Sequence, residues 1–169
     1  KQRKVLQDEE RINELLAVDI TSGFIWAELH EQVSRWIRRV NAYGITKWVL
    51  YLAALEEEPR INLRRIQDEL RRCEGQDVSL ETIKDVLVKL SRGDLIDYKS
   101  FGDWFGKIED PILNDFLKVW GRIEVQGNAR ENVQEDLVNQ YRRLRKQIAD
   151  YTGYVAEVFM IQVLWNTQR

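Results

Sequence analysis

Apolar residues recur every three or four positions along most of the chain, which is the pattern of amphipathic helices. Three short runs of this kind follow one another between residues 45 and 92, and polar connections separate them. Asn62 and Ser79 precede the second and third runs and are suited to cap a helix. The pattern therefore predicts three short helices in succession. Their apolar positions are Ile45, Trp48, Val49, Leu52 and Leu55, then Leu63, Ile66 and Leu70, and finally Leu80, Ile83, Val86, Leu87 and Leu90.

The residues after the third helix predict a β-hairpin. Gly93 is placed to end the helix in the left-handed conformation. Residues 95–98 and 104–108 are rich in aromatic and β-branched side chains, and residues 100–103 form a turn between them. A two-stranded ribbon is marginal in isolation, so it must pack on the helices. This is the order of a winged helix-turn-helix domain, and we predict a mainly α fold with a two-stranded β wing.

Helices are also predicted ahead of this central region. Residues 1–20 form a charged helix with sparse apolar points, and Thr21 or Ser22 caps the next helix. That next helix carries an apolar stripe of only about two heptads, which favours packing on the main body over a coiled coil. Residues 1–44 are thus predicted to be N-terminal helices before a winged helix at 45–110. The stripe consists of Trp26, Leu29, Val33, Trp36 and Val40.

A helical extension is predicted over residues 111–169. Its first helix is amphipathic and breaks at Gly127. A long helix then runs to about Tyr151, and Gly153 interrupts it. Residues 154–165 are densely apolar but too few to cross a bilayer. They form either a buried helix or a helix covering a surface whose partner is missing.

Composition limits the function. The 169 residues carry a formal net charge of −2, so no global basic field attracts nucleic acid. Cys73 is the only cysteine, which excludes an intrachain disulfide and suits a reducing cytoplasm. No apolar run approaches the roughly 20 residues of a membrane span, so we predict a cytoplasmic protein without a membrane partner. The chain begins with Lys1 rather than Met, and we expect it to be a piece of a longer protein.

The sequence predicts no enzyme active site. It lacks a glycine-rich loop with a lysine that would cradle a nucleotide, and one cysteine with one histidine cannot form a zinc site. His30 lies on a charged stretch and is interpreted as a surface residue, whereas Cys73 falls on an apolar stripe and is interpreted as buried. The run Glu56-Glu57-Glu58 is interpreted as a solvated helix end. We therefore expect no catalytic residue, no metal and no cofactor.

Local basic residues leave contact with DNA open. Residues 59–72 contain five arginines against Asp68 and Glu69, a net charge of +3. In a winged helix the helix before the wing enters the major groove, but here that helix is nearly neutral. These basic residues could form a phosphate-binding face, or they could simply solvate the exterior of the helices. Contact with DNA and contact with protein are therefore equally open. The candidate DNA-binding residues are Arg64, Arg65, Lys84, Lys89, Arg92, Lys99 and Lys107. A second cluster is interpreted as a solvated helix face: Arg142, Arg143, Arg145 and Lys146.

One segment resembles a known family. Archaeal-type P-loop ATPases, a branch of the AAA+/STAND group, carry a winged helix whose wing runs into an "x-D-P-x-L-x-x-F-L" pattern. The residues that match it here are Asp110, Pro111, Leu113, Phe116 and Leu117. Residues 93–96 are similar to the "G-x-[LI]-[LIV]" motif that leads into that wing, and residues 153–159 resemble the helix that opens the restriction-endonuclease-like domain of many members.

The resemblance implies a winged helix that follows an ATPase core, with the ATPase and any nuclease function outside this chain. Glu157 alone is not a catalytic site. The leading hypothesis is a non-catalytic winged-helix module that binds DNA or regulates a larger ATPase. Its partners would be double-stranded DNA, a second copy of the chain or the ATPase core. The alternatives are a protein–protein interaction or dimerisation module and a free-standing transcription regulator.

Overall fold

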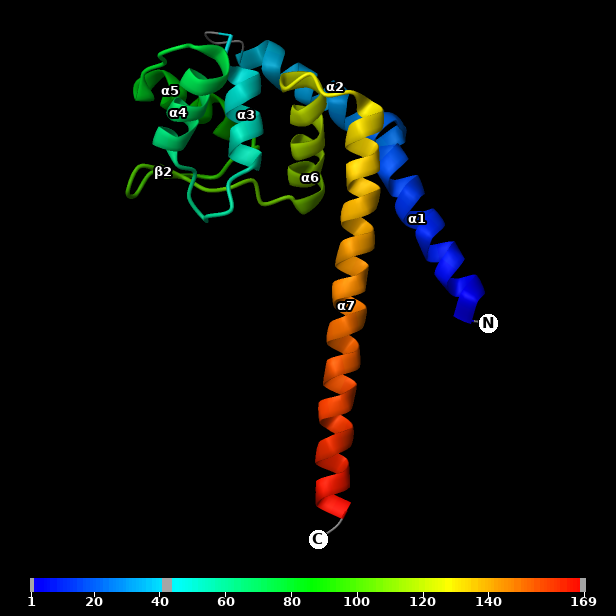
Figure 1. The fold of residues 1–169 in the computed structure, drawn as a ribbon. Helices are drawn as coiled ribbons and strands as arrows, with labels where there is room; N and C mark the ends of the chain where they lie inside the picture. Colours follow the sequence, from blue (N-terminus) through cyan, green and yellow to red (C-terminus); the bar gives the residue numbers. More distant parts are fainter. Residues whose placement is uncertain (1, 41–43, 168–169) are drawn as a thin grey trace. The chain divides into compact units, whose positions relative to one another are not determined.

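The computed structural model describes residues 2–40 and 44–167. These residues form a mainly helical fold with one two-stranded antiparallel sheet, as the sequence predicted (Figure 1). The chain divides into two compact units, residues 19–133 and residues 1–18 with 134–169, and each is described by itself. The elements in chain order are α1 (Gln2–Ser22), α2 (Phe24–Val40), α3 (Thr46–Ala54), α4 (Leu63–Glu74), α5 (Leu80–Ser91), β1 (Tyr98–Lys99), β2 (Trp104–Phe105), α6 (Pro111–Trp120), the π-helical turn η1 (Gly121–Val125) and α7 (Arg130–Thr167).

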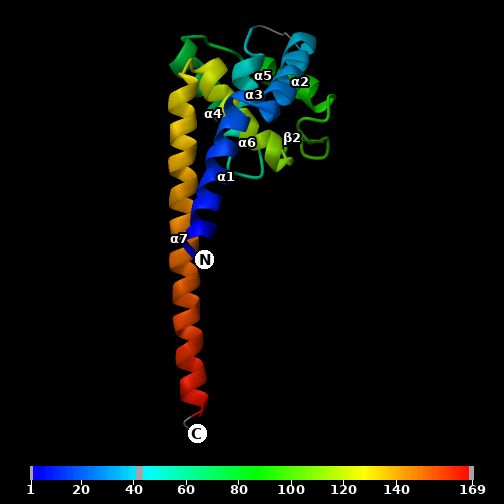
Figure 2. The same ribbon diagram turned by 90° about the vertical axis from the view of Figure 1, so that its right-hand side faces the viewer.

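Helices α3, α4 and α5 pack against one another within the unit of residues 19–133. Figures 1 and 2 both show them gathered, with the hairpin at their edge. The two predicted caps are confirmed: Asn62 Oδ1 accepts the N–H groups of Arg64 and Arg65, and Ser79 Oγ accepts that of Thr82. Each cap satisfies N–H groups that have no partner within the helix. The three helices contribute to the core the fully buried Leu50, Ile66, Leu70, Ile83 and Leu87.

The predicted hairpin is present, with shorter strands than the sequence suggested. Tyr98 lies opposite Phe105 and Lys99 opposite Trp104 in an antiparallel pair. The turn covers residues 100–103, as predicted. Ahead of Tyr98 the pairing adds one backbone hydrogen bond, from the Gly106 N–H to the Asp97 carbonyl at 2.7 Å. Leu95 and Ile96, which were predicted as strand residues, lie before this bond and are buried.

The connection between α3 and α4 fixes the hairpin to the helices. Arg60 forms a β-bridge with Gly106. The N–H of Ile61 donates to the carbonyl of Phe105 at 2.9 Å, and the N–H of Lys107 donates to the carbonyl of Pro59 at 3.2 Å. Since a two-stranded ribbon is marginal alone, this third backbone partner beside β2 and the burial of the Phe105 ring hold it in place.

Helix α6 begins at a capped Asp-Pro step. The Asp110 carboxylate accepts the N–H groups of Ile112 and Leu113 at 2.9 and 3.0 Å, and Pro111 occupies the first turn, where a missing N–H costs nothing. The helix packs on α2 and α3 and passes at Gly121 into the π-helical turn η1. The sequence pattern gave no sign of this change from α to π geometry.

Helix α2 packs on α3, α5 and α6, which confirms that its stripe faces the main body. Its first N–H, that of Phe24, donates to Asp19 Oδ1 at 2.6 Å, a contact the sequence analysis did not anticipate. After α5 the prediction for Gly93 is wrong, because the left-handed residue is Asp94 with φ 57°. Aspartate tolerates this conformation better than most side chains do.

Helix α7 is continuous from Arg130 to Thr167, so the predicted interruption at Gly153 is wrong (Figure 1). A glycine inside a helix costs only about 1 kcal/mol relative to alanine, and the flanking residues outweigh that cost. The apolar stretch that starts at Tyr154 therefore continues the long helix. Of the helices described, none is both long and apolar enough to span a membrane.

Candidate functional site

The candidate DNA-binding residues on α4 differ in their surroundings. Arg64 is exposed and forms no ion pair within residues 2–40 and 44–167. Arg65 Nη1 lies 3.0 Å from Glu56 Oε1. Glu56 is buried and also accepts the Asn62 N–H at 3.3 Å, so its interpretation as part of a solvated helix end is wrong. The Glu56 carboxylate is buried because it bonds to Asn62 and Arg65, which lie across the loop between α3 and α4.

The candidate lysines on α5 and the hairpin lie beside carboxylates. Lys84 Nζ is 2.5 Å from Asp103 Oδ2, and Lys89 Nζ is 2.6 Å from Asp85 Oδ2. Lys99 forms an ion pair with Asp97 in the same way. Four of the seven candidates therefore have an acidic partner within the fold: Arg65, Lys84, Lys89 and Lys99. No ion pair is found for the other three in the part of the chain that the structure describes: Arg64, Arg92 and Lys107.

Asp103 joins the hairpin turn to α5. Its carboxylate accepts hydrogen bonds from Lys84 Nζ and from the Tyr98 hydroxyl, the latter at 2.8 Å. The hydrogen bond from Lys84, followed by that from Tyr98, lowers the pKa of Asp103 below its ordinary value. The hydrogen bond from Lys84 to Asp103 raises the pKa of Lys84, and the hydrogen bond from Tyr98 to Asp103 raises the pKa of Tyr98. The turn is therefore tethered to the helix before it by charge.

Replacing Lys84 by glutamine is expected to raise the pKa of Asp103 toward its ordinary value, because the main group that lowers it is gone. A carboxyl whose folded-state pKa is depressed stabilises the fold above its unfolded pKa, and that contribution is lost as pH falls through the folded pKa. Carbon-13 NMR titration of the Asp103 carboxyl measures the shift. Lys89→Gln is the matched control, because Lys89 pairs with Asp85, and it should leave Asp103 unchanged.

The face built by α5 and the hairpin has no excess positive charge. Residues 80–108 contain five cations and five carboxylates, a net charge of zero. Residues 60–74 contain five arginines against three carboxylates, a net charge of +2. One of those arginines, Arg60, lies over the Trp104 ring at 4.7 Å from its centroid. Phosphate binding depends on uncompensated cations, so the face built by α5 and the hairpin offers little to a DNA backbone.

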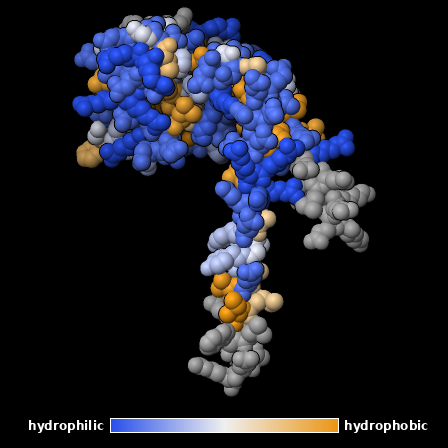
Figure 3. Space-filling model, viewed as in Figure 1, coloured by the Kyte–Doolittle hydropathy of each residue, from blue (hydrophilic) through white to orange (hydrophobic). Residues whose placement is uncertain are grey.

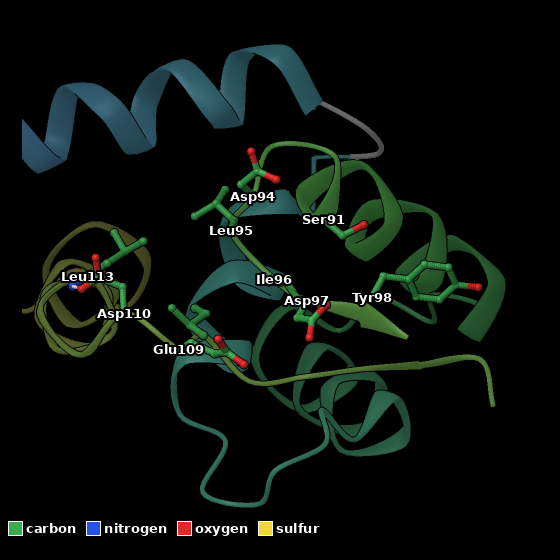
Figure 4. A pocket seen from close by; sticks show the side chains of 10 residues that line it. Ser91, Asp94, Leu95, Ile96, Asp97, Tyr98, Glu109, Asp110 and Leu113 are labelled. Carbon is green, nitrogen blue, oxygen red and sulfur yellow. Dashed lines mark hydrogen bonds between the residues drawn. The ribbon is translucent and has the colours of Figure 1, made fainter. Parts of the chain in front are cut away.

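A pocket of about 370 Å³ lies between the end of α5, the segment before β1 and the start of α6 (Figure 4). Two of its four carboxylates are already engaged: Asp97 pairs with Lys99, and Asp110 caps α6. Ser91 Oγ donates to the carbonyl of Val88 at 2.9 Å. Nowhere in the described chain do three or more candidate metal-ligating side chains come together.

The interpretation of Cys73 as a buried residue is wrong, because its side chain is exposed on α4. Its Sγ lies 3.8 Å from a Glu69 carboxylate oxygen. His30 stacks on the Trp26 ring with centroids 5.2 Å apart and lies 3.9 Å from Glu124, so it is part of the packing rather than of a reactive pair.

Large apolar side chains are exposed along α7. Figure 3 shows orange patches on the lower part of that helix. We name one stripe of α7 the α7 seam. Its residues alternate by four and three over about three heptads, the spacing of a coiled coil. The residues from Leu144 onward are 36% to 69% exposed. The α7 seam consists of Leu137, Tyr141, Leu144, Ile148, Tyr151, Val155 and Val158. Leu137 is buried, so the exposed part of the seam begins beyond it.

An open groove runs along part of the seam. It has a volume of about 320 Å³ and lies between Ile12 and Asn13 of α1 and the Tyr141–Ile148 part of α7. Glu14 and Arg142 bridge its two sides at 3.4 Å. Ile12 remains 53% exposed and Ile148 66% exposed, so the groove is open to solvent.

The fold and these surfaces define a mainly helical protein with a small antiparallel hairpin and an apolar helical seam. Comparison with family models, with curated proteins and with solved structures finds no match to this chain.

Proposed function

We propose that this chain is a non-catalytic winged-helix module that acts through protein–protein contact. The observation that carries the proposal is the α7 seam, which exposes large apolar side chains along one face of a helix. Contiguous apolar patches on a protein surface usually mark a site of contact with another protein. A helix with such a stripe gains most of its stability from a partner that buries it.

The winged-helix assignment is supported by the order of elements and by one long-range contact. Three packed helices precede an antiparallel hairpin. The bridge between Arg60 and Gly106 ties that hairpin to the connection between the first two helices, so the hairpin is an integral part of the trihelical unit. The capped step at Asp110-Pro111 is consistent with the resemblance to archaeal-type ATPases, and we propose that the module serves an ATPase of that class.

Charge favours protein over DNA as the partner. The α5–hairpin face is neutral overall, and Lys84, Lys89 and Lys99 would each have to leave a carboxylate to reach a phosphate. A second candidate function, contact with duplex DNA, is favoured by one observation: Arg64, Arg92 and Lys107 have no acidic partner in the described chain. Three cations are few beside the contacts that DNA-binding domains usually make.

A duplex titration tests the proposal. We expect the anisotropy of a labelled duplex of about 25 base pairs to show no salt-dependent binding, because only three candidate cations are uncompensated. If the chain does bind DNA through them, the slope of log affinity against log salt should be about −3. The triple variant Arg64→Gln, Arg92→Gln, Lys107→Gln should then abolish binding. Arg71→Gln with Arg72→Gln is the control, because Asp77 and Glu69 already pair with these arginines. Salt-dependent binding that the triple variant abolishes would replace the proposed protein–protein contact with DNA binding.

A further inference from the structure

The C-terminal ends of α2 and α5 border another pocket, with a volume of about 240 Å³, which we name the α2–α5 pocket. Its apolar lining includes Leu90 and Leu95, which are buried, and the partly exposed ring of Trp36. A Cβ atom at Gly93 would lie 3.9 Å from both Cδ1 and Nε1 of Trp36, so the N–H edge of the indole lies on this side. The pocket therefore combines apolar walls with a hydrogen-bond donor.

The charged residues that line the α2–α5 pocket are all cations: Arg39, Lys89 and Arg92. Asp85 compensates Lys89, since its Oδ2 lies 2.6 Å from the lysine Nζ. Arg39 and Arg92 are exposed and form no ion pair within the residues that the structure describes. Asp94, although close in the chain, lines the pocket of Figure 4 instead. Two arginines beside the α2–α5 pocket are thus left without a negative partner in the described chain.

The position of these arginines at helix ends does not account for them fully. Cations in the last turn of a helix offset the negative end of its dipole. Arg38 of α2 is engaged within its own helix, where Nε donates to the carbonyl of Ser34 at 3.3 Å. Neither Arg39 nor Arg92 donates to a carbonyl among the described residues. Their guanidinium groups are therefore available to a ligand.

We infer that the α2–α5 pocket binds an acidic peptide segment of a partner protein. An apolar side chain of the peptide would occupy the pocket, and its carboxylates would pair with Arg39 and Arg92. Guanidinium groups bind carboxylates through strong, charge-assisted hydrogen bonds. Tryptophan and arginine are also the residues that most often dominate the energy of protein interfaces, and Trp36 lies beside both arginines in this pocket.

The apolar walls favour a peptide over a DNA backbone. A phosphate backbone brings negative charge but no apolar side chain that could cover Leu90 and Leu95. A peptide with glutamate beside leucine or phenylalanine brings both. The inference goes beyond the proposed function, because it assigns a contact to α2 and α5 rather than to the α7 seam.

Fluorescence anisotropy with the full chain tests the chemistry of the ligand. The probe is a labelled, capped peptide of sequence Glu-Glu-Leu-Phe-Glu-Glu. One comparison peptide has glutamine at every glutamate, and another has serine at the leucine and the phenylalanine. We expect each comparison peptide to bind at least ~10-fold more weakly than the acidic probe, because each lacks one half of the complementarity. Binding of the probe should weaken as salt is added, since salt screens exposed charges.

Paired arginine variants test the location. Arg39→Gln with Arg92→Gln should weaken binding of the acidic probe at least ~10-fold, because both uncompensated cations are lost. Arg35→Gln with Arg38→Gln is the matched control. It removes the same charge from residues of α2 that do not line the pocket, one of which already pairs with Glu31, and should change the affinity less than ~3-fold. Circular dichroism shows whether each variant is folded.

The outcomes separate the inference from the proposed function. Equal binding of the acidic and glutamine peptides, or equal losses in the pocket and control variants, overturns the inference. A chain that binds neither the probe nor duplex DNA overturns the inference alone and leaves the proposed function standing. Duplex DNA that displaces the probe, and whose binding is lost in the Arg39 and Arg92 variant, overturns both, because the pocket would then serve a phosphate backbone.

Discussion

Replacing Gly121 by alanine is expected to lower the free energy of unfolding by about 3 kcal/mol, at the upper end of the usual cost of overpacking. A Cβ atom at this position would lie 1.9 Å from Cδ2 and 2.3 Å from Cγ of Tyr51. Tyr51 is only 3% exposed, so its ring has no free space to move into. Gly121 also begins the π-helical turn η1, where α3 and η1 pack together. Either the turn or α3 must shift to admit one methyl group.

Urea denaturation of the parent chain and of Gly121→Ala measures this cost. Gly153→Ala is the matched control, since nothing lies within 4 Å of the added methyl group and the residue is inside α7. It should leave the core unchanged and favour the helix by up to about 1 kcal/mol. A second check is coupling: in the Gly121→Ala background, Tyr51→Leu should cost less than it does in the parent chain. A free energy of unfolding for Gly121→Ala within about 0.5 kcal/mol of the parent value would contradict the close packing of Gly121 against Tyr51.

The elements that the sequence predicted correctly are those set by local rules. The caps at Asn62 and Ser79 follow from one side chain that reaches an N–H two or three residues ahead. The turn at residues 100–103 follows from Ser100, Gly102 and Asp103, which lie between two aromatic segments. Helix periodicity extends over a dozen residues, and no distant contact is needed to produce it.

What the sequence did not predict depends on residues far apart or on competing local effects. The burial of Glu56 follows from its contacts with Asn62 and Arg65 across a loop. The pairing of Lys84 with Asp103 joins positions 19 apart, which no periodic pattern shows. These contacts decide whether a cation is free for a phosphate, so a candidate site that is chosen from charge alone overstates the basic face.

The α7 seam was readable in principle. Its spacing of four and three runs without a break from Leu137 to Val158. The interpretation of Gly153 as a helix end divided it into two shorter segments and hid its length. A glycine at a position off the seam removes no seam contact, so the periodicity was the stronger signal. Cys73 shows the opposite error, since the stripe of α4 was extended one step too far toward its exposed end.

Replacing Phe116 by alanine is expected to lower the free energy of unfolding by about 3–5 kcal/mol. Phe116 is fully buried on α6, and its ring packs against Trp26 of α2 with centroids 5.5 Å apart. Trp26 cannot move into the cavity easily. His30 stacks on its ring, and the Arg130 guanidinium lies 4.3 Å from the ring centroid. A site that cannot collapse keeps its cavity, which places the cost in the upper part of that range.

Phe101 provides the matched control for this cavity. It lies in the hairpin turn and is 98% exposed, so Phe101→Ala removes the same atoms from the surface and should change stability by less than about 0.5 kcal/mol. Urea denaturation followed by tryptophan fluorescence measures both variants, and unchanged denaturant slopes would show that the denatured state is the same. Since a domain of this size is stable by only about 5–15 kcal/mol, Phe116→Ala should be partly unfolded on mild heating. Equal stability of the two alanine variants would contradict the central position of Phe116, because only a buried ring leaves a cavity behind.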